Sequence, residues 1–226
     1  MDLDLSSKVD LLAFQDKLVR AMAIDLGDFF EIQLLGESFR PVDEIDTYRF
    51  ALDVRLNDRR FMRMGIDVGF ADPWLGTAEV LESSAVLGFA GVKPITVKAI
   101  PIEQHIAEKL HAYTRTYGGR QSSRVKDLVD LVLLSAYRPV TAAELAGILD
   151  SVFRSRATHG LPKSFPLPPE DWGDVYRKLS ETLPITSDIG EAHASVAAFL
   201  DPVLGSRGAR SWDPITRIWV AAEAPA

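Results

Sequence analysis

Two aspartates stand near the start of the chain, separated by one leucine, in the run Met1-Asp2-Leu3-Asp4-Leu5. On a β-strand, alternation would bring Asp2 and Asp4 to one face and the leucines to the other. Two neighbouring carboxylates repel unless they are exposed or bridged by a cation, and Mg²⁺ prefers such hard oxygen ligands. The pattern therefore predicts a metal platform, and the alternative is a solvated acidic N-terminus.

A third aspartate, Asp67, lies inside an apolar run between the β-branched residues Ile66 and Val68. Strand interiors disfavour aspartate, and a buried carboxylate without a partner is destabilising. Alternation would place Ile66 and Val68 on one side of the strand and Asp67 on the other. Three aspartates on neighbouring strands can hold divalent ions for phosphoryl transfer. The alternative is that Asp67 lies on the solvent face of an amphipathic strand.

Two further polar groups lie downstream. Lys109 stands among apolar neighbours in the run IAEKLHA, where it can reach a nucleotide phosphate as a point charge. Lys126, Asp127 and Asp130 follow in a second helical run and share one helical surface. An exposed ion pair between Lys126 and Asp130, worth at most roughly 0.5 kcal/mol, is the alternative explanation of that spacing.

The elements that would position these residues begin with a helix over residues 10–26, which Gly27 ends. Strands are expected at residues 29–35, 47–56, 60–70 and 94–99, with a hairpin-length connection at 57–59. Helices are expected at 101–113, 124–134, 141–156, 168–183 and 187–200, the third capped by Thr141 with Glu144 three residues on. The predicted fold is α+β, with a small, mainly antiparallel sheet over 1–100 and a helical domain over 101–226.

The composition excludes several kinds of site and of targeting segment. The 226 residues include no cysteine, which excludes disulfides and thiolate metal sites. No secretory signal or membrane-length apolar run is present, so we expect a cytoplasmic protein without a membrane partner. His105 and His111 lack the spacing of helical zinc ligands.

The net charge of −7 means that a nucleic acid would have to meet a local basic patch. Such a cluster surrounds Gly118-Gly119, where it could guide an RNA acceptor or nucleotide phosphates; ordinary solvated surface is the alternative. Its members are Arg115, Arg120, Arg124 and Lys126.

The order of these features resembles the AbiEii/AbiGii family of nucleotidyltransferase-like toxins. The resemblance covers roughly residues 2–134, and its most distinctive parts are AEKLHAYTR at 107–115 and VKDLVDL at 125–131. It implies a sheet of nucleotidyltransferase type, related to DNA polymerase beta, that uses Mg²⁺ and an NTP. It further implies a toxin of a toxin–antitoxin or phage-defence system, with a cognate antitoxin, that transfers a nucleotide to an RNA such as tRNA or to a protein.

The resemblance also assigns roles to residues. Asp2 and Asp4 resemble the metal-binding Asp-x-Asp pair of the family. Asp67 resembles its third carboxylate, a metal ligand that helps to activate the attacking hydroxyl.

Lys109 resembles the lysine of the family's KL motif and would contact phosphate, together with Arg124 and Lys126 of the basic cluster. Asp127 resembles the acidic residue of the last motif, with Asp130 as the competitor for that role.

In the family, a helix and a small Gly/Ser loop that cradles the triphosphate precede the Asp-x-Asp strand, whereas this sequence begins one residue before Asp2. The sequence therefore predicts either a start further upstream or an N-terminally truncated member. A catalytically inactive binding protein, or a metal-dependent nuclease using the same carboxylates, are the alternative functions.

Overall fold

The computed structural model describes residues 2–7, 9–35, 40–41, 47–70, 77–86, 88–116, 124–205 and 210–221, with the backbone alone at residues 2–4, 6, 40, 41, 47 and 90. The chain forms two compact units, Met1–Pro73 and Trp74–Ala226. This division falls earlier than the predicted one after residue 100, because residues 77–99 belong by their contacts to the second unit.

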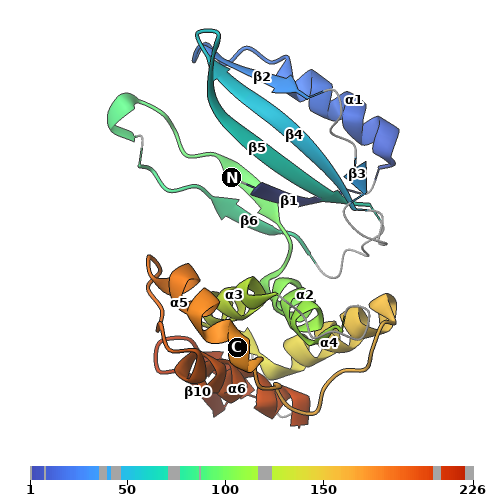
Figure 1. Ribbon diagram of the computed structural model, residues 1–226, viewed down its shortest axis with the longest axis vertical. Coiled ribbons are helices and arrows are strands. Elements are labelled where there is room, and N and C mark those ends of the chain that lie inside the picture. Colours follow the sequence, from blue (N-terminus) through green and yellow to red (C-terminus); the bar gives the residue numbers. More distant parts are fainter. Residues whose placement is uncertain are drawn as a thin grey trace. The chain divides into compact units, whose positions relative to one another are not determined.

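The first unit is a five-stranded sheet with one helix on it (Figure 1). The helix is α1 (Leu11–Met22), and the strands are β1 (Asp2–Ser6), β2 (Phe30–Leu34), β3 (Arg40–Pro41), β4 (Thr47–Leu56) and β5 (Arg59–Gly69). The strand order is β1-β5-β4-β2, and β3 also pairs with β4. Among the strand pairs that the structure describes in this unit, β1–β5 alone is parallel. The predicted small, mixed, mainly antiparallel sheet is thus confirmed.

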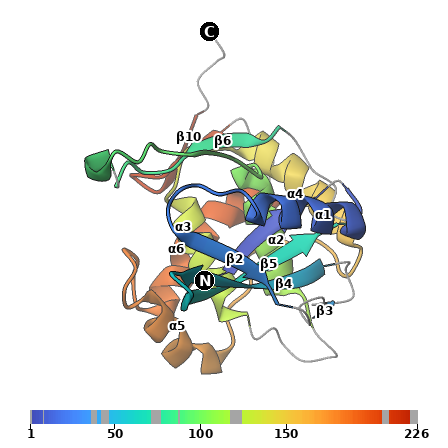
Figure 2. The same ribbon diagram turned by 90° about the horizontal axis from the view of Figure 1, so that it is seen from above.

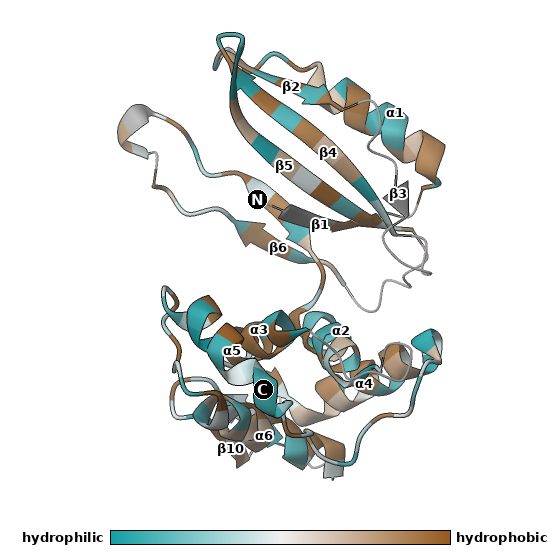
Figure 3. Cartoon of the chain, viewed as in Figure 1, coloured by the Kyte–Doolittle hydropathy of each residue, from teal (hydrophilic) through white to brown (hydrophobic). Residues whose placement is uncertain are grey.

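One face of this sheet is apolar, and α1 covers it (Figure 2). The buried residues of this face are Phe50 and Leu52 on β4 and Ile66 and Val68 on β5, two residues apart on each strand. Figure 3 shows hydrophobic and hydrophilic residues interspersed along both strands. The helix packs on them through Leu11, Phe14, Leu18 and Met22. It ends at Met22, earlier than the predicted residue 26, and the chain then turns through Gly27 with a positive φ of 70°.

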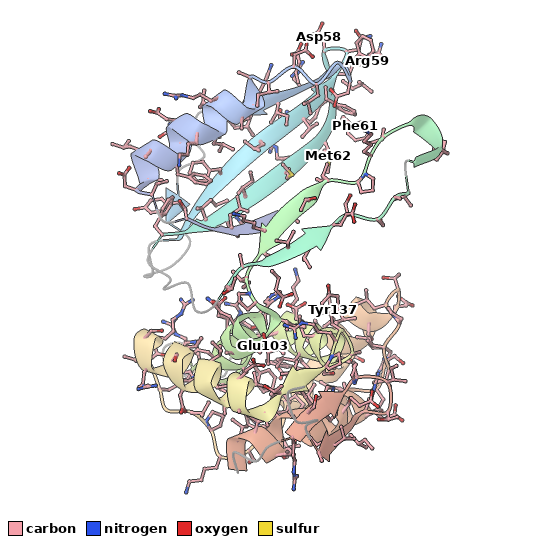
Figure 4. All side chains as sticks on the ribbon, turned by 180° about the vertical axis from the view of Figure 1, so that it is seen from behind. Asp58, Arg59, Phe61, Met62, Glu103 and Tyr137 are labelled. Atoms are coloured by element: carbon pink, nitrogen blue, oxygen red, sulfur yellow. The ribbon has the colours of Figure 1, made fainter. Side chains whose placement is uncertain are left out.

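A two-residue turn joins β4 to β5. Asn57 and Asp58 both have positive φ, 48° and 62°, as a type I′ turn requires. Figure 4 shows Asp58 and Arg59 at this turn, with Phe61 and Met62 following on β5. A register shift between Val54 and Arg55 then adds one residue on β5, so the turn and this bulge together determine which face Asp67 occupies.

The second unit is mainly helical (Figure 1). Its helices are α2 (Ile102–Thr114), α3 (Val125–Ser135), α4 (Ala142–Arg156), α5 (Gly173–Ser180) and α6 (Ile189–Gly205), with short 3-10 helices η1 (Gly88–Ala90) and η2 (Glu170–Trp172). Its strands are β6 (Glu79–Glu82), β7 (Thr96–Ala99), β8 (Val140–Thr141), β9 (Arg210–Asp213) and β10 (Ile218–Ala221). The strands β6 and β7 form one ladder, and β10-β9-β8 form another sheet.

Helix α4 begins as the sequence predicts, because the Thr141 side chain accepts a hydrogen bond from the backbone N–H of Glu144. The predicted α+β class is confirmed, whereas the sheet of β8, β9 and β10 was not predicted. In the described part of the chain, no helix has the length and apolar character needed to cross a membrane.

A buried tryptophan ties the unpredicted sheet to the helices. Trp212 on β9 is buried, packs against Phe199 and Trp219, and donates from its indole nitrogen to the carbonyl oxygen of Ser135 at 2.7 Å. We expect Trp212→Phe to lower the free energy of unfolding by about 1–2 kcal/mol, because it leaves a buried carbonyl unpaired and removes volume. Urea unfolding measures this change.

The control is Ile215→Ala in the β9–β10 turn, where the side chain is 91% exposed. It should stay within about 0.5 kcal/mol of the unchanged protein. Equal stabilities for Trp212→Phe and the unchanged protein would contradict the role given to the indole.

Candidate active site

Asp67 lies on the polar face of the first unit's sheet, opposite the face that α1 covers. Its neighbours Ile66 and Val68 are buried in the core under α1. The Asp67 side chain is 16% exposed, so it is neither fully buried nor freely solvated. The alternation that the sequence predicted for this strand is therefore present.

The strand that carries the first two aspartates lies directly beside Asp67. Strand β1 runs parallel to β5, with Asp4 in register with Asp67 and Asp2 in register with Gly65. Neighbouring strands lie about 4.8 Å apart, and paired positions share one face of a sheet. The positions of Asp2, Asp4 and Asp67 therefore belong to the same face. The side chains of Asp2 and Asp4 lie outside the described part of the structure.

Arg49, which the sequence analysis did not single out, binds Asp67. From β4, its Nε and Nη2 atoms donate to the two carboxylate oxygens of Asp67 at 2.6 and 2.5 Å. Arg49 is also the β4 residue in register with Asp67. Asp4, Asp67 and Arg49 thus occupy one lateral row across three strands. The sequence did contain a signal for this residue, since Arg49 stands next to the apolar Phe50 in the predicted strand 47–56 and alternation places the two side chains on opposite faces.

A second paired carboxylate, Asp53, lies further along β4 on the same face. Its oxygens lie 2.9 Å from Nη2 of Arg60 and 3.2 Å from Nε of Arg63. Burial raises the pKa of Asp53, but the hydrogen bonds and charges of Arg63 and Arg60 outweigh burial and hold the pKa below its ordinary value. This carboxylate is ionised and enclosed by two guanidinium groups, a pairing that no sequence pattern predicted.

In the second unit, Lys109 on α2 binds two aspartates of α3. Its Nζ atom lies 2.7 Å from Asp130 and 3.6 Å from Asp127. The structure therefore brings together the lysine and both acidic residues that the sequence singled out. Asp130 bonds to Lys109, and no ion pair between Lys126 and Asp130 occurs among the described contacts. Lys126 itself is exposed.

Asp127 is the most buried member of this group. Its side chain is 2% exposed, and its Oδ2 atom lies 2.8 Å from Nε of Arg124, at ion-pair distance but without hydrogen-bond geometry. Burial raises the pKa of Asp127 above its ordinary value, and the charges of Arg124 and Lys109 offset this only in part. The basic cluster expected from the sequence is described at Arg115, Arg124 and Lys126, whereas Arg120 and Gly118-Gly119 lie outside the described residues.

Glu79, on β6, organises the start of α2. It accepts a hydrogen bond from the backbone N–H of Ile102, and its carboxylate lies 2.5 Å from Arg138, which also binds Glu103. Burial raises the pKa of Glu79, but Arg138 and the Ile102 N–H together bring the pKa below its ordinary value. Figure 4 shows Glu103 among the helices of this unit. The network explains how α2 starts without a capping side chain of its own.

His111 belongs to a polar cluster at the end of α2. Its Nε2 lies 2.8 Å from the Thr158 hydroxyl, and its ring packs 4.6 Å from that of His159. The His159 ring in turn bonds to the hydroxyls of Thr114 and Thr158. Burial, and then the charges of His159, Arg156 and Arg115, lower the pKa of His111 to about 4.

This histidine should make stability depend on pH. The pKa of His111 rises from about 4 in the folded protein to its ordinary 6.5 on unfolding, so the unfolded chain binds more protons between these values. The contribution is fully present above pH 6.5 and is lost as the pH falls towards 4, by on the order of 2 kcal/mol. Urea unfolding at pH 7.5 and 4.5 measures the loss. It should be smaller in His111→Gln, and an identical loss in both proteins would contradict this origin.

The polar face of the first unit offers oxygen donors that suit Mg²⁺. Asp67 contributes a partly exposed carboxylate, and the register places two more aspartate positions on the adjacent strand. Among the side chains that the structure describes, no three His, Cys, Asp or Glu residues gather as a metal centre, and those of Asp2 and Asp4 are outside that set. The donor chemistry of this face therefore fits a hard divalent cation.

Comparisons with known proteins agree with these observations. Residues 1–209 match the family model described as nucleotidyl transferase AbiEii toxin, type IV TA system. No curated protein matches the chain. Among solved structures, the chain is similar to MenT4, a nucleotidyltransferase toxin from Mycobacterium tuberculosis H37Rv, with a TM-score of 0.53 and 16% identity over 96% of this chain and 70% of that one. This likeness confirms the nucleotidyltransferase-type fold. Since the family model matches most of the chain, the protein belongs to the AbiEii family of nucleotidyl transferase toxins of type IV toxin–antitoxin systems.

Proposed function

We propose that this protein is a toxin that transfers a nucleotide from an NTP to an RNA acceptor, such as tRNA, or to a protein acceptor in the cytoplasm. The observation that supports this best is the register of β1 with β5, in which Asp4 pairs with Asp67 on the polar face of the sheet. The family membership supports the reaction class. A cognate antitoxin is the partner that such a toxin requires.

The carboxylates of Asp2, Asp4 and Asp67 would hold Mg²⁺, which neutralises charge developing on the transferred phosphate. Asp67 also orients the attacking hydroxyl of the acceptor. A bond forms between this hydroxyl oxygen and the α-phosphorus, the bond from the α-phosphorus to the bridging oxygen breaks, and pyrophosphate leaves. The hydroxyl proton passes to solvent water, and no atom changes its oxidation state, so the step needs no redox partner.

The cations of the second unit would contact phosphate. Lys109 is held in place by Asp130 and Asp127, which fixes a flexible side chain before substrate arrives. The guanidinium of Arg124 is half-exposed and Lys126 is exposed, so both can approach a nucleotide or RNA phosphate from solvent.

Nucleotide binding and product analysis test this function together. Calorimetry with Mg²⁺ and each of the four NTPs should show binding of at least one of them. Incubation of that NTP with cellular RNA and protein should then extend one acceptor. Binding without transfer would instead identify a non-catalytic binding protein, and release of mononucleotides from RNA would identify a nuclease; either result would overturn the proposal.

A further inference from the structure

Arg49 and Asp67 form a two-point ion pair on the face proposed for the metal. The planar guanidinium group matches the carboxylate, and both oxygens of Asp67 are engaged at 2.5–2.6 Å. A divalent cation bound by Asp67 would need at least one of these same oxygens. Arg49 and a bound metal ion would therefore compete for the same lone pairs of the Asp67 carboxylate.

Asp67 lies between strands β1 and β4 in the sheet, because β5 pairs with both of them. Asp4 and Asp67 are in register on neighbouring strands, so the positions of these two proposed metal ligands lie side by side on one face of the sheet. Arg49, on the other side of Asp67 in the same row, supplies one compensating positive charge. A divalent ion would supply two charges and would serve the aspartates on both strands.

Asp67 can also exchange Arg49 for another cation. The Arg49 side chain is 49% exposed, so water can solvate its guanidinium when it leaves. Asp53 on the same face is different, since it is only 5% exposed and is enclosed by both Arg60 and Arg63. Of these two paired carboxylates, Asp67 is the one that can change its partner.

We propose that Arg49 is a positioning residue that competes with the divalent cation for Asp67, so that the metal binds by displacing the guanidinium. This inference rests on the proposed function, because it takes Asp67 as a metal ligand. Arg49 holds the carboxylate in place while no metal is bound and sets the cation concentration at which the site fills. The protein would thereby select for conditions in which the cation, or its complex with nucleotide, is abundant.

Titration with Mn²⁺ alone, followed by the electron paramagnetic resonance signal of the free ion, tests this proposal without any activity assay. Arg49→Gln removes the competitor and one nearby positive charge, so Mn²⁺ should bind roughly tenfold more tightly. Arg49→Lys keeps the charge but loses the two-point geometry, and its affinity should lie between those of Arg49→Gln and the unchanged protein. Asp67→Asn should bind Mn²⁺ much more weakly.

Arg63→Gln is the matched control. It makes the same change of charge on the same sheet face, but Arg63 serves Asp53 and lies four residues from Asp67 along β5, about 13 Å away. At physiological salt this distance exceeds the screening length of about 8 Å, so its Mn²⁺ affinity should stay within about twofold of the unchanged protein. Circular dichroism establishes that each variant is folded.

The outcomes separate the two claims. Suppose that the unchanged protein binds Mn²⁺. If Arg49→Gln does not raise the Mn²⁺ affinity, or if Arg63→Gln raises it by the same factor, the role given to Arg49 is wrong and the proposed function stands. If Arg49→Gln does not fold, an Arg49→Lys affinity equal to that of the unchanged protein overturns the role. If neither the unchanged protein nor any Arg49 variant binds Mn²⁺, the carboxylate site fails, and the proposed function fails with it.

Discussion

Replacing Asp67 with asparagine is expected to lower the rate of nucleotide transfer by about 10²–10³-fold. The substitution keeps the volume of the side chain but removes the negative charge that would bind the metal and orient the acceptor hydroxyl. Because the ion pair with Arg49 is partly exposed, its loss should change the free energy of unfolding by less than about 1 kcal/mol. Transfer of label from the α-phosphate of the NTP measures the rate, and thermal unfolding measures the stability.

Asp58→Asn is the control for this substitution. Asp58 lies in the type I′ turn at a positive φ of 62°, a conformation that asparagine adopts readily. The same chemical change at this position should leave the transfer rate within about twofold and the stability within about 0.5 kcal/mol of the unchanged protein. A folded Asp67→Asn protein that keeps a third or more of the transfer rate would remove Asp67 from the active site.

Replacing Lys109 with methionine is expected to destabilise the protein by about 3 kcal/mol, because it leaves the buried carboxylate of Asp127 without one of its two cations. The loss should shrink as the pH falls. Burial already raises the pKa of Asp127, and without Lys109 this carboxyl takes up a proton more readily in the folded protein. Urea unfolding at pH 7.5 and 5 measures both effects.

The double substitution Lys109→Met with Asp127→Asn separates stability from activity. Removing both charges should recover more than half of the lost stability, whereas the transfer rate should stay low if Lys109 has the phosphate contact that we propose for it. Lys126→Met, at an exposed position of α3, should change stability by less than about 0.5 kcal/mol. A Lys109→Met protein as stable as the unchanged one would show that the buried ion pairs contribute little.

The first unit's sheet was predictable because its strands carry strong local patterns. The alternation of apolar and polar residues predicted the strand at 47–56 with its observed limits, and the next strand differs by only one residue at each end. The strands β9 and β10 were missed because each has four residues, and tertiary contacts, such as the bond from Trp212 to Ser135, stabilise them. Such tertiary contacts cannot be predicted from the pattern of neighbouring residues in the sequence.

The residue types of the candidate site were predictable, but its partners were not. An aspartate in an apolar strand and a lysine in an apolar helix are visible as exceptions to local patterns. The lateral neighbour of a strand residue depends on strand order and register, which a single sequence does not specify. Arg49 and Asp53 therefore emerged only from the structure, as did the burial of Asp127 beside an exposed Lys126.

The claim that this face of the sheet performs nucleotidyl transfer is tested most directly by following both ends of the NTP. The protein is incubated with Mg²⁺, cellular RNA and protein, and an NTP labelled at the α-phosphate or, in a parallel reaction, at the γ-phosphate. We expect the α-label in the acceptor and an equal amount of γ-label in pyrophosphate, and neither product with Asp67→Asn. An α-label that never reaches an acceptor, or equal transfer by the Asp67→Asn protein, would contradict the account.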